Sequence, residues 1–197
     1  MRFISRDFHR VMPVLALSLL GLSLFGCEPS SAEVEGGEIS SAAGPAASGP
    51  LSAMLGGYET VRRALLDDHL DGVAEAASSI GKSASELAED FSAEAAGVPA
   101  EKVGELKPLL ASISLASKEL AQTEDLGAAR KAFWALTEPL MKYRELAGSD
   151  DLRVAYCPMA GKSWLQPDGE IGNPYYGQSM ATCGAFVEPE PAAGSDS

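Results

Sequence analysis

Apolar residues recur at steps of three and four along residues 51–143, in four successive blocks separated by short polar stretches. This spacing places the apolar side chains of each block on one face of an α-helix. Four such helices joined by short connections can bury their apolar faces only against one another. The sequence therefore predicts an all-α fold, an antiparallel four-helix bundle over residues 51–148 that is followed by an irregular C-terminal segment. The four predicted faces consist of Leu51, Met54, Tyr58, Val61 and Leu65; Val73, Ala77, Ile80, Ala84, Leu87 and Phe91; Val103, Leu106, Leu110, Ile113 and Leu120; and Leu126, Ala129, Phe133, Leu136, Leu140 and Tyr143.

Prolines, a threonine and a glycine predict where these helices begin, bend and end. Pro99 suits the first turn of the third helix, where a missing backbone N–H costs nothing. Thr123 is expected to cap the fourth helix and Gly148 to end it. Pro108 and Pro139 fall inside the third and fourth blocks and are expected to bend those helices.

Two polar stretches flank the predicted domain. Residues 28–50 are rich in Ser, Ala, Gly, Pro and Glu and have almost no large apolar side chain to bury, which predicts a disordered tether. Residues 188–197 have the same character and predict a disordered tail. Residues 51–187 then form one domain of ordinary size, with the bundle at 51–148 and a motif-bearing segment at 151–187.

The N-terminus has the layout of an export signal. Three arginines precede an uncharged run over residues 11–25 that is too short to span a bilayer comfortably. The run ends in Leu24-Phe25-Gly26-Cys27, which resembles the lipobox of bacterial lipoproteins. We therefore expect residues 1–26 to be a lipoprotein signal peptide and Cys27 to be acylated, which anchors the chain stably on the periplasmic side of the inner or the outer membrane. The alternative is an ordinary signal peptide with Cys27 nearby by chance.

Removal of residues 1–26 would leave 12 basic and 27 acidic side chains, a net charge of about −15. A nucleic-acid partner is therefore not expected, because the phosphate backbone attracts basic surfaces. The acidic residues are interspersed along the predicted helices, a pattern typical of a solvated surface.

The residue pattern changes at Asp151, where the helical spacing of apolar residues stops and prolines and glycines are expected to divide the chain into turns. Residues 152–156 are a candidate short strand. This segment contains two of the three cysteines of the whole chain, Cys157 and Cys183, together with Met159 and Met180. A turn-rich stretch that gathers rare residue types is the first place to look for a functional site.

Four short motifs follow one another in this segment: Tyr156-Cys157-Pro158-Met159, Trp164-Leu165-Gln166, Glu170-Ile171-Gly172-Asn173-Pro174-Tyr175-Tyr176-Gly177 and Met180-Ala181-Thr182-Cys183-Gly184. Their order and spacing resemble a bacterial domain of unknown function, found alone in exported proteins and fused to periplasmic adaptor subunits of heavy-metal efflux pumps of the resistance-nodulation-division type. The resemblance covers about two thirds of the chain and implies a helical domain with this motif last. It also implies a link to copper or silver handling, with a metal-efflux adaptor as a possible partner.

The side chains themselves favour the same chemistry. Thiolate and thioether sulfurs are soft donors that prefer copper(I) or silver to hard cations. Cys157 and Met159 would share one face of an extended segment, and Met180 and Cys183 one face of a helical turn. These four residues are the predicted metal ligands. Because the bundle supplies its own apolar core, no metal is expected to be required for folding.

A disulfide between Cys157 and Cys183 is the competing prediction. Two cysteines of an exported protein meet an oxidising compartment, where they commonly pair. Such a bond would close the glycine-rich segment into a loop, and Met159 and Met180 would then only fill space. The residues leave both possibilities open.

No enzyme is predicted. The sequence has no recognisable arrangement of nucleophile, base and orienting residue, and the only histidine after Cys27 is His69. Two functions of different kinds therefore remain. One is an envelope lipoprotein that binds a soft metal ion, and the other is a disulfide-stapled, non-catalytic interaction module that docks on an envelope partner such as an efflux adaptor.

Overall fold

The computed structural model describes residues 49–187. These residues lie within one compact unit of the chain. The predicted lipidation site Cys27, the signal peptide at 1–26, nearly all of the predicted tether and the predicted tail at 188–197 lie outside the described residues.

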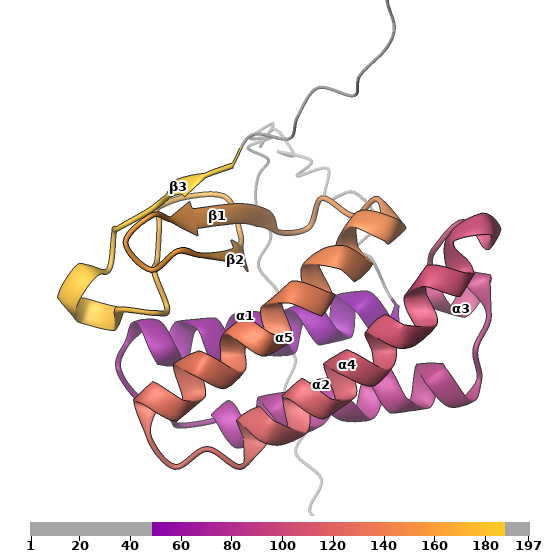
Figure 1. Cartoon of the computed structure of the whole chain (residues 1–197), viewed down its shortest axis with the longest axis horizontal. Coiled ribbons are helices and arrows are strands. Elements are labelled where there is room, and N and C mark those ends of the chain that lie inside the picture. The colour runs from indigo at the N-terminus through magenta and orange to yellow at the C-terminus, as the bar shows by residue number, and fades with distance from the viewer. Residues whose placement is uncertain (1–48, 188–197) are drawn as a thin grey trace, which may run out of the picture. The chain divides into compact units, whose positions relative to one another are not determined.

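Four long helices make up most of the described chain (Figure 1). They are α1 (Pro50–Leu66), α2 (Val73–Glu89), α4 (Val103–Ala121) and α5 (Leu126–Ala147). The short helix α3 (Ala93–Ala96) and the 3-10 turn η1 (Ala100–Lys102) connect α2 to α4. Each long helix packs on the next one along the chain, and α5 returns to contact α1.

The core between the helices contains the predicted apolar faces. The largest buried side chains include Tyr58, Phe133 and Tyr143, which come from α1 and α5. Fully buried leucines and isoleucines from all four helices fill the space around them. Burial of such side chains is the main favourable contribution to folding, at about 1.5–3 kcal/mol for each one.

Helix ends agree with the predictions at some positions and differ at others. Gly148 ends α5 in the left-handed conformation, with φ 63°, as predicted. Asp125, and not Thr123, caps the start of α5, since its carboxylate accepts a hydrogen bond from the Ala128 amide at 2.9 Å. The Thr123 hydroxyl instead donates to the Leu120 carbonyl at the end of α4. Pro108 and Pro139 both lie inside helices.

The prediction of an all-α fold is wrong. The described chain is about 62% helical, but it also contains a three-stranded antiparallel sheet, so the fold is mixed α/β and not a pure four-helix bundle. Strand β1 (Arg153–Cys157) pairs with β2 (Lys162–Gln166) on one side and with the two-residue strand β3 (Ala185–Phe186) on the other. Figure 1 shows this sheet outside the helices, in brown and yellow.

The physical reason for the sheet is the need to pair backbone groups. The C-terminal segment contributes buried side chains such as Leu152, Trp164 and Leu165 to the core. A backbone that approaches a core must find partners for its N–H and C=O groups, and a ladder of strands supplies them. The turn at 158–161, which contains Pro158 and Gly161, joins β1 and β2 with a hydrogen bond of 2.9 Å from the Gly161 amide to the Cys157 carbonyl, whereas Gly172 and Gly184 lie outside turns.

Candidate functional site

The sheet brings Cys157 and Cys183 together. Cys157 is the last residue of β1, and Cys183 lies two residues before β3. The pairing of Tyr156 with Ala185 places the two cysteines side by side, and their Sγ atoms are 2.8 Å apart. Cys157 is fully buried, whereas Cys183 is partly exposed. Residues separated by 26 positions in the sequence therefore form one pair of sulfurs.

Hydrogen bonds make the two thiols unequal. Burial opposes ionisation of Cys157, but its Sγ shares a hydrogen bond with the Cys183 thiol and accepts one from the Ala160 amide at 3.4 Å, and together these contacts hold the pKa of Cys157 below its ordinary value. The pKa of Cys183 is raised, first because its thiol is hydrogen-bonded to Cys157 and then because of burial. Cys157 is therefore the sulfur that carries a negative charge more readily.

The two predicted methionine ligands do not share the burial of Cys157. Met159 lies in the turn between β1 and β2, and 68% of its surface is exposed. Met180 is half-buried at the end of the 3-10 turn η2 (Gly177–Met180), where its carbonyl accepts a hydrogen bond from the Cys183 amide at 3.1 Å. Across residues 49–187, no group of three or more His, Cys, Asp or Glu side chains is placed to hold a metal ion.

The two cysteines are unbonded in the structure, and the spacing of their sulfurs can be compared with that of a chelating pair and of a disulfide. Two thiolates bound tetrahedrally to one ion at about 2.3 Å would lie about 3.8 Å apart, and a more open angle at the ion would separate them further. The observed 2.8 Å is shorter than this separation and approaches a disulfide bond of about 2.05 Å. The two free thiols are therefore close enough to form a disulfide.

Arg62 holds the motif segment against α1. It is only 6% exposed, and its guanidinium is paired with Glu59 through two hydrogen bonds of 2.6 and 2.8 Å. Its remaining Nη1 donates to the Gly172 carbonyl at 2.9 Å. A Cβ atom on residue 172 would lie 2.6 Å from Arg62 Nη1 and 2.8 Å from a methyl group of Leu66, so any other residue here would force these side chains to move.

A second anchor joins the ends of α1 and α5 to the same segment. Arg130 donates to the carbonyls of Pro174 and Leu65, both at 2.9 Å, and forms an ion pair with Asp68. Asp68 in turn accepts a hydrogen bond from the Gln178 amide at 3.1 Å. The hydrogen bond from Arg130, followed by that from Gln178, lowers the pKa of Asp68.

Aromatic rings fill the space between the segment and α5. The Tyr175 ring lies 6.0 to 6.3 Å from the rings of Phe133, Trp134 and Trp164, and its hydroxyl donates to the Ser163 carbonyl at 2.7 Å. The Tyr58 hydroxyl hydrogen-bonds with Thr137 at 2.8 Å and accepts from the Leu165 amide at 3.2 Å. Burial raises the pKa of both Tyr58 and Tyr175. These rings support packing, and their hydroxyls remain protonated at neutral pH.

Asn173 organises the loop that carries Cys183. Its buried side chain donates to the Cys183 carbonyl at 2.8 Å and accepts from the Tyr175 amide at 2.9 Å. Its own amide donates to the Ala181 carbonyl at 2.7 Å. Asn173 was predicted only as part of a motif and a turn, and the contacts made by Asn173, Arg62 and Arg130 were not predicted. Only Arg62 could have been noticed in the sequence, because it lies next to Val61 in the apolar face of α1. An arginine that is buried in such a face requires a partner.

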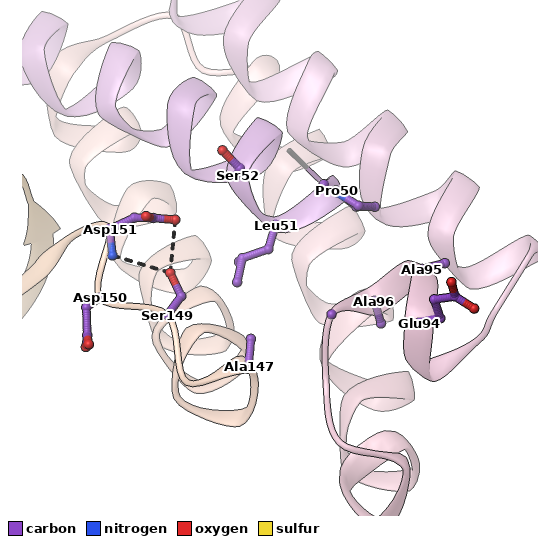
Figure 2. A pocket seen from close by; sticks show the side chains of 12 residues that line it. Pro50, Leu51, Ser52, Glu94, Ala95, Ala96, Ala147, Ser149, Asp150 and Asp151 are labelled. Atoms are coloured by element: carbon purple, nitrogen blue, oxygen red, sulfur yellow. Dashed lines mark hydrogen bonds between the residues drawn. The ribbon is translucent and has the colours of Figure 1, made fainter. Parts of the chain in front are cut away.

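Two of the surface pockets differ in character. The larger, about 600 Å³, lies where α1 begins, between α3 and the end of α5 (Figure 2). Its walls include Leu51, Ala96 and Ala147, with the carboxylates of Glu94, Asp150 and Asp151 around them, and the Ser149 hydroxyl donates a hydrogen bond to Asp151 at 3.0 Å. The smaller, about 390 Å³, lies beside the cysteine pair and is lined by Tyr156, Pro158, Cys183, Gly184, Ala185, Phe186 and Val187.

No protein-family model, curated protein or solved structure matches the chain. Within the described residues, no helix is both long enough and apolar enough to cross a membrane.

Proposed function

We propose that this chain is a lipid-anchored protein of the bacterial envelope whose segment 151–187 is a disulfide-stapled, non-catalytic module for docking on an envelope partner. The observation that carries this proposal is the 2.8 Å separation of the Cys157 and Cys183 sulfurs, with one of them buried. Exported proteins meet an oxidising compartment in which such a pair becomes a disulfide. Acylation at Cys27 would place the module at a membrane surface.

The contacts of the motif residues, together with the apolar side chains that stay exposed, support an interaction module. Gly172 and Tyr175 contact the helices, and the buried Asn173 holds the segment's own loop through the Cys183 carbonyl. The apolar side chains that remain exposed in this segment are those of Tyr156, Met159 and Val187, at 41%, 68% and 48%. These side chains lie around the smaller pocket or next to it along the chain, and exposed apolar groups of this kind are typical of a contact surface. The resemblance to domains fused to efflux adaptors suggests such an adaptor as the partner.

Binding of copper(I) or silver is the second candidate function. It is favoured by the lowered pKa of Cys157, because a thiolate compensates the charge of a soft cation. The two sulfurs would have to move apart from their 2.8 Å contact to bind one ion. In this candidate the reduced cysteines would bind the ion, and Met159 and Met180 would assist. We expect replacement of either cysteine by serine to weaken binding far more than replacement of either methionine by leucine.

A photo-crosslinking experiment in intact cells separates the two functions. A crosslinking amino acid at position 156 or 187 is expected to trap a specific envelope protein in the wild-type background and much less of it when Cys157 is replaced by alanine. Position 115 is the matched control, since Leu115 is 61% exposed on α4, outside the segment. Absence of crosslinks at 156 and 187, together with uptake of one copper(I) or silver ion by the reduced protein in competition with a weak chelator, would favour the metal-binding function instead.

The anchor is tested separately. Cys27→Ser is expected to release the protein from the membrane fraction and to abolish labelling by a fatty-acid analogue. Unchanged membrane association of this variant, with no lipid label on the wild type, would remove the anchor from the proposal.

A further inference from the structure

The two sulfurs of the Cys157–Cys183 pair differ in their access to solvent. Cys157 is fully buried in the core behind the sheet. Cys183 is partly exposed and lines the 390 Å³ pocket together with Pro158 and Phe186, whereas Cys157 does not line this pocket. A molecule that reaches the pair from solvent therefore meets Cys183 first.

The surroundings of the buried sulfur suit a leaving group. The Ala160 amide donates a hydrogen bond to Cys157 Sγ at 3.4 Å, from the turn that follows β1. A hydrogen-bond donor aimed at a sulfur stabilises the thiolate that forms there when a disulfide opens. The pair therefore has one sulfur placed for attack and the other placed to accept the electrons.

We propose that the Cys157–Cys183 disulfide is redox-active and that a protein dithiol of the envelope reduces it by attack at Cys183. This inference rests on the proposed disulfide staple and adds an activity to it. In the first step, a thiolate of the dithiol forms a bond to Cys183 Sγ, the bond between the two cysteines breaks, and its electron pair remains on Cys157 as a thiolate. In the second step, the other thiol of the reductant loses its proton and attacks its own mixed-disulfide sulfur, which releases Cys183. Two electrons and two protons pass to the pair, and the reductant becomes a disulfide.

The loop around Cys183 favours reversal of this exchange. The Asn173 side chain holds the Cys183 carbonyl at 2.8 Å, and the Met180 carbonyl accepts from the Cys183 amide at 3.1 Å. These hydrogen bonds do not depend on the bond between the sulfurs. We therefore expect the reduced cysteines to stay in contact and to reoxidise without refolding of the domain.

Glutathione is a simple probe for this proposal. The full-length protein, exported and purified in detergent, is first denatured without reductant to count the thiols of Cys157 and Cys183. Free thiols at both positions at this stage would refute the staple itself, and the redox proposal with it. If the disulfide is present, the native protein is treated briefly with reduced glutathione, quenched with acid, alkylated, and digested for mass spectrometry.

The distribution of labels then decides the proposal. We expect glutathione on Cys183 and the alkyl group on Cys157, with a preference of at least about tenfold. An even distribution, a preference for Cys157, or a disulfide that resists millimolar glutathione in the native protein would overturn the redox proposal and leave the staple intact.

A charge substitution tests whether the pocket is the route to Cys183. Val187 is exposed and lines this pocket, so Val187→Glu is expected to slow the reaction with anionic glutathione by about threefold. Leu115→Glu adds the same charge to α4 and is expected to leave the rate unchanged. Equal rates for both variants and the wild type would contradict an approach through the pocket.

Discussion

The helical part of the domain and its C-terminal segment are held together by different forces. Within residues 50–147, fully buried apolar side chains from four helices pack on one another. Within residues 151–187, a few buried side chains such as Trp164 are accompanied by many hydrogen bonds to the helices, through Arg62, Arg130 and Tyr58. The comparison indicates that the helices supply their own core, whereas the segment acquires its structure by docking on them, with Cys157 and Cys183 in contact within it.

The ring contacts make these two parts dependent on each other. Tyr58 of α1 stacks on Phe133 of α5 at 4.6 Å, and Phe133 contacts Tyr175 of the segment. Because these ring contacts link the helices to the C-terminal segment, we expect the domain to unfold in one cooperative transition.

Trp164→Ala is expected to have the largest effect. The Trp164 ring is fully buried, and its Nε1 donates to Gln166 at 2.8 Å. Removal of a buried aromatic ring should lower the free energy of unfolding by about 3–5 kcal/mol. Urea unfolding followed by far- and near-ultraviolet circular dichroism measures this loss. Coincident transitions would support one cooperative domain, and a segment that melts alone, with the helices unchanged, would contradict it.

A pair of glycine substitutions compares the two parts directly. Gly172→Ala would force a Cβ into Arg62 and Leu66, and is expected to destabilise the domain by about 1–3 kcal/mol. Gly56→Ala in α1 meets no atom within 4 Å and is expected to stabilise it by about 0.5–1 kcal/mol. Denaturant midpoints of the two variants should therefore move in opposite directions. A neutral Gly172→Ala would show that the segment docks more loosely than the structure indicates.

Asn173→Ala is expected to lower the free energy of unfolding by about 1–3 kcal/mol, because it leaves the Cys183 carbonyl and the Tyr175 amide without this partner. The loop that carries Cys183 should loosen before the rest of the domain. Under reducing conditions, the thiol of Cys183 should become alkylated faster in this variant than in the wild type. The same alkylation rate in both proteins would mean that Asn173 does not order the loop.

Acidic pH is expected to have the smallest effect on stability. It should act on the ion pair between Asp68 and Arg130. The pKa of Asp68 is lowered in the folded chain by its hydrogen bonds from Arg130 and Gln178. Its contribution to stability is therefore fully present above the unfolded-state pKa of about 4 and is lost as the pH falls through the lower folded-state value. Asp68→Asn should lose less stability between pH 7 and pH 3 than the wild type. An identical pH dependence in the two proteins would show that this ion pair contributes nothing.

The helices could be located from the sequence because their apolar spacing is long and regular. Residues such as Met54, Tyr58 and Val61 all face the core, as the period of 3.6 requires. The sheet was missed because β2 spans only Lys162–Gln166 and β3 only Ala185–Phe186, too short for an alternation to stand out among glycines and prolines. Only residues 152–156 gave a strand signal, and β1 is found there at Arg153–Cys157.

The site could be predicted only in part. The concentration of cysteines in one segment pointed to Cys157 and Cys183, and the structure places these two in contact. The anchors could not be found in the same way, because Arg62 lies 110 positions before Gly172 and Arg130 lies 44 positions before Pro174. Contacts over such separations depend on the packing of the helices and leave no local pattern in the sequence.

The state of Cys157 and Cys183 in the exported protein tests the central claim most directly. The chain is expressed with its own N-terminus, alkylated under denaturing conditions before any reduction, and digested for mass spectrometry. We predict one peptide pair joined through Cys157 and Cys183, with no alkyl group on either residue. Chain-entropy arguments for a loop of this length suggest that the bond stabilises the domain by about 3.5 kcal/mol, so reductant should lower the denaturant midpoint of the wild type. Complete alkylation of both cysteines, with a midpoint that reductant does not change, would contradict the account.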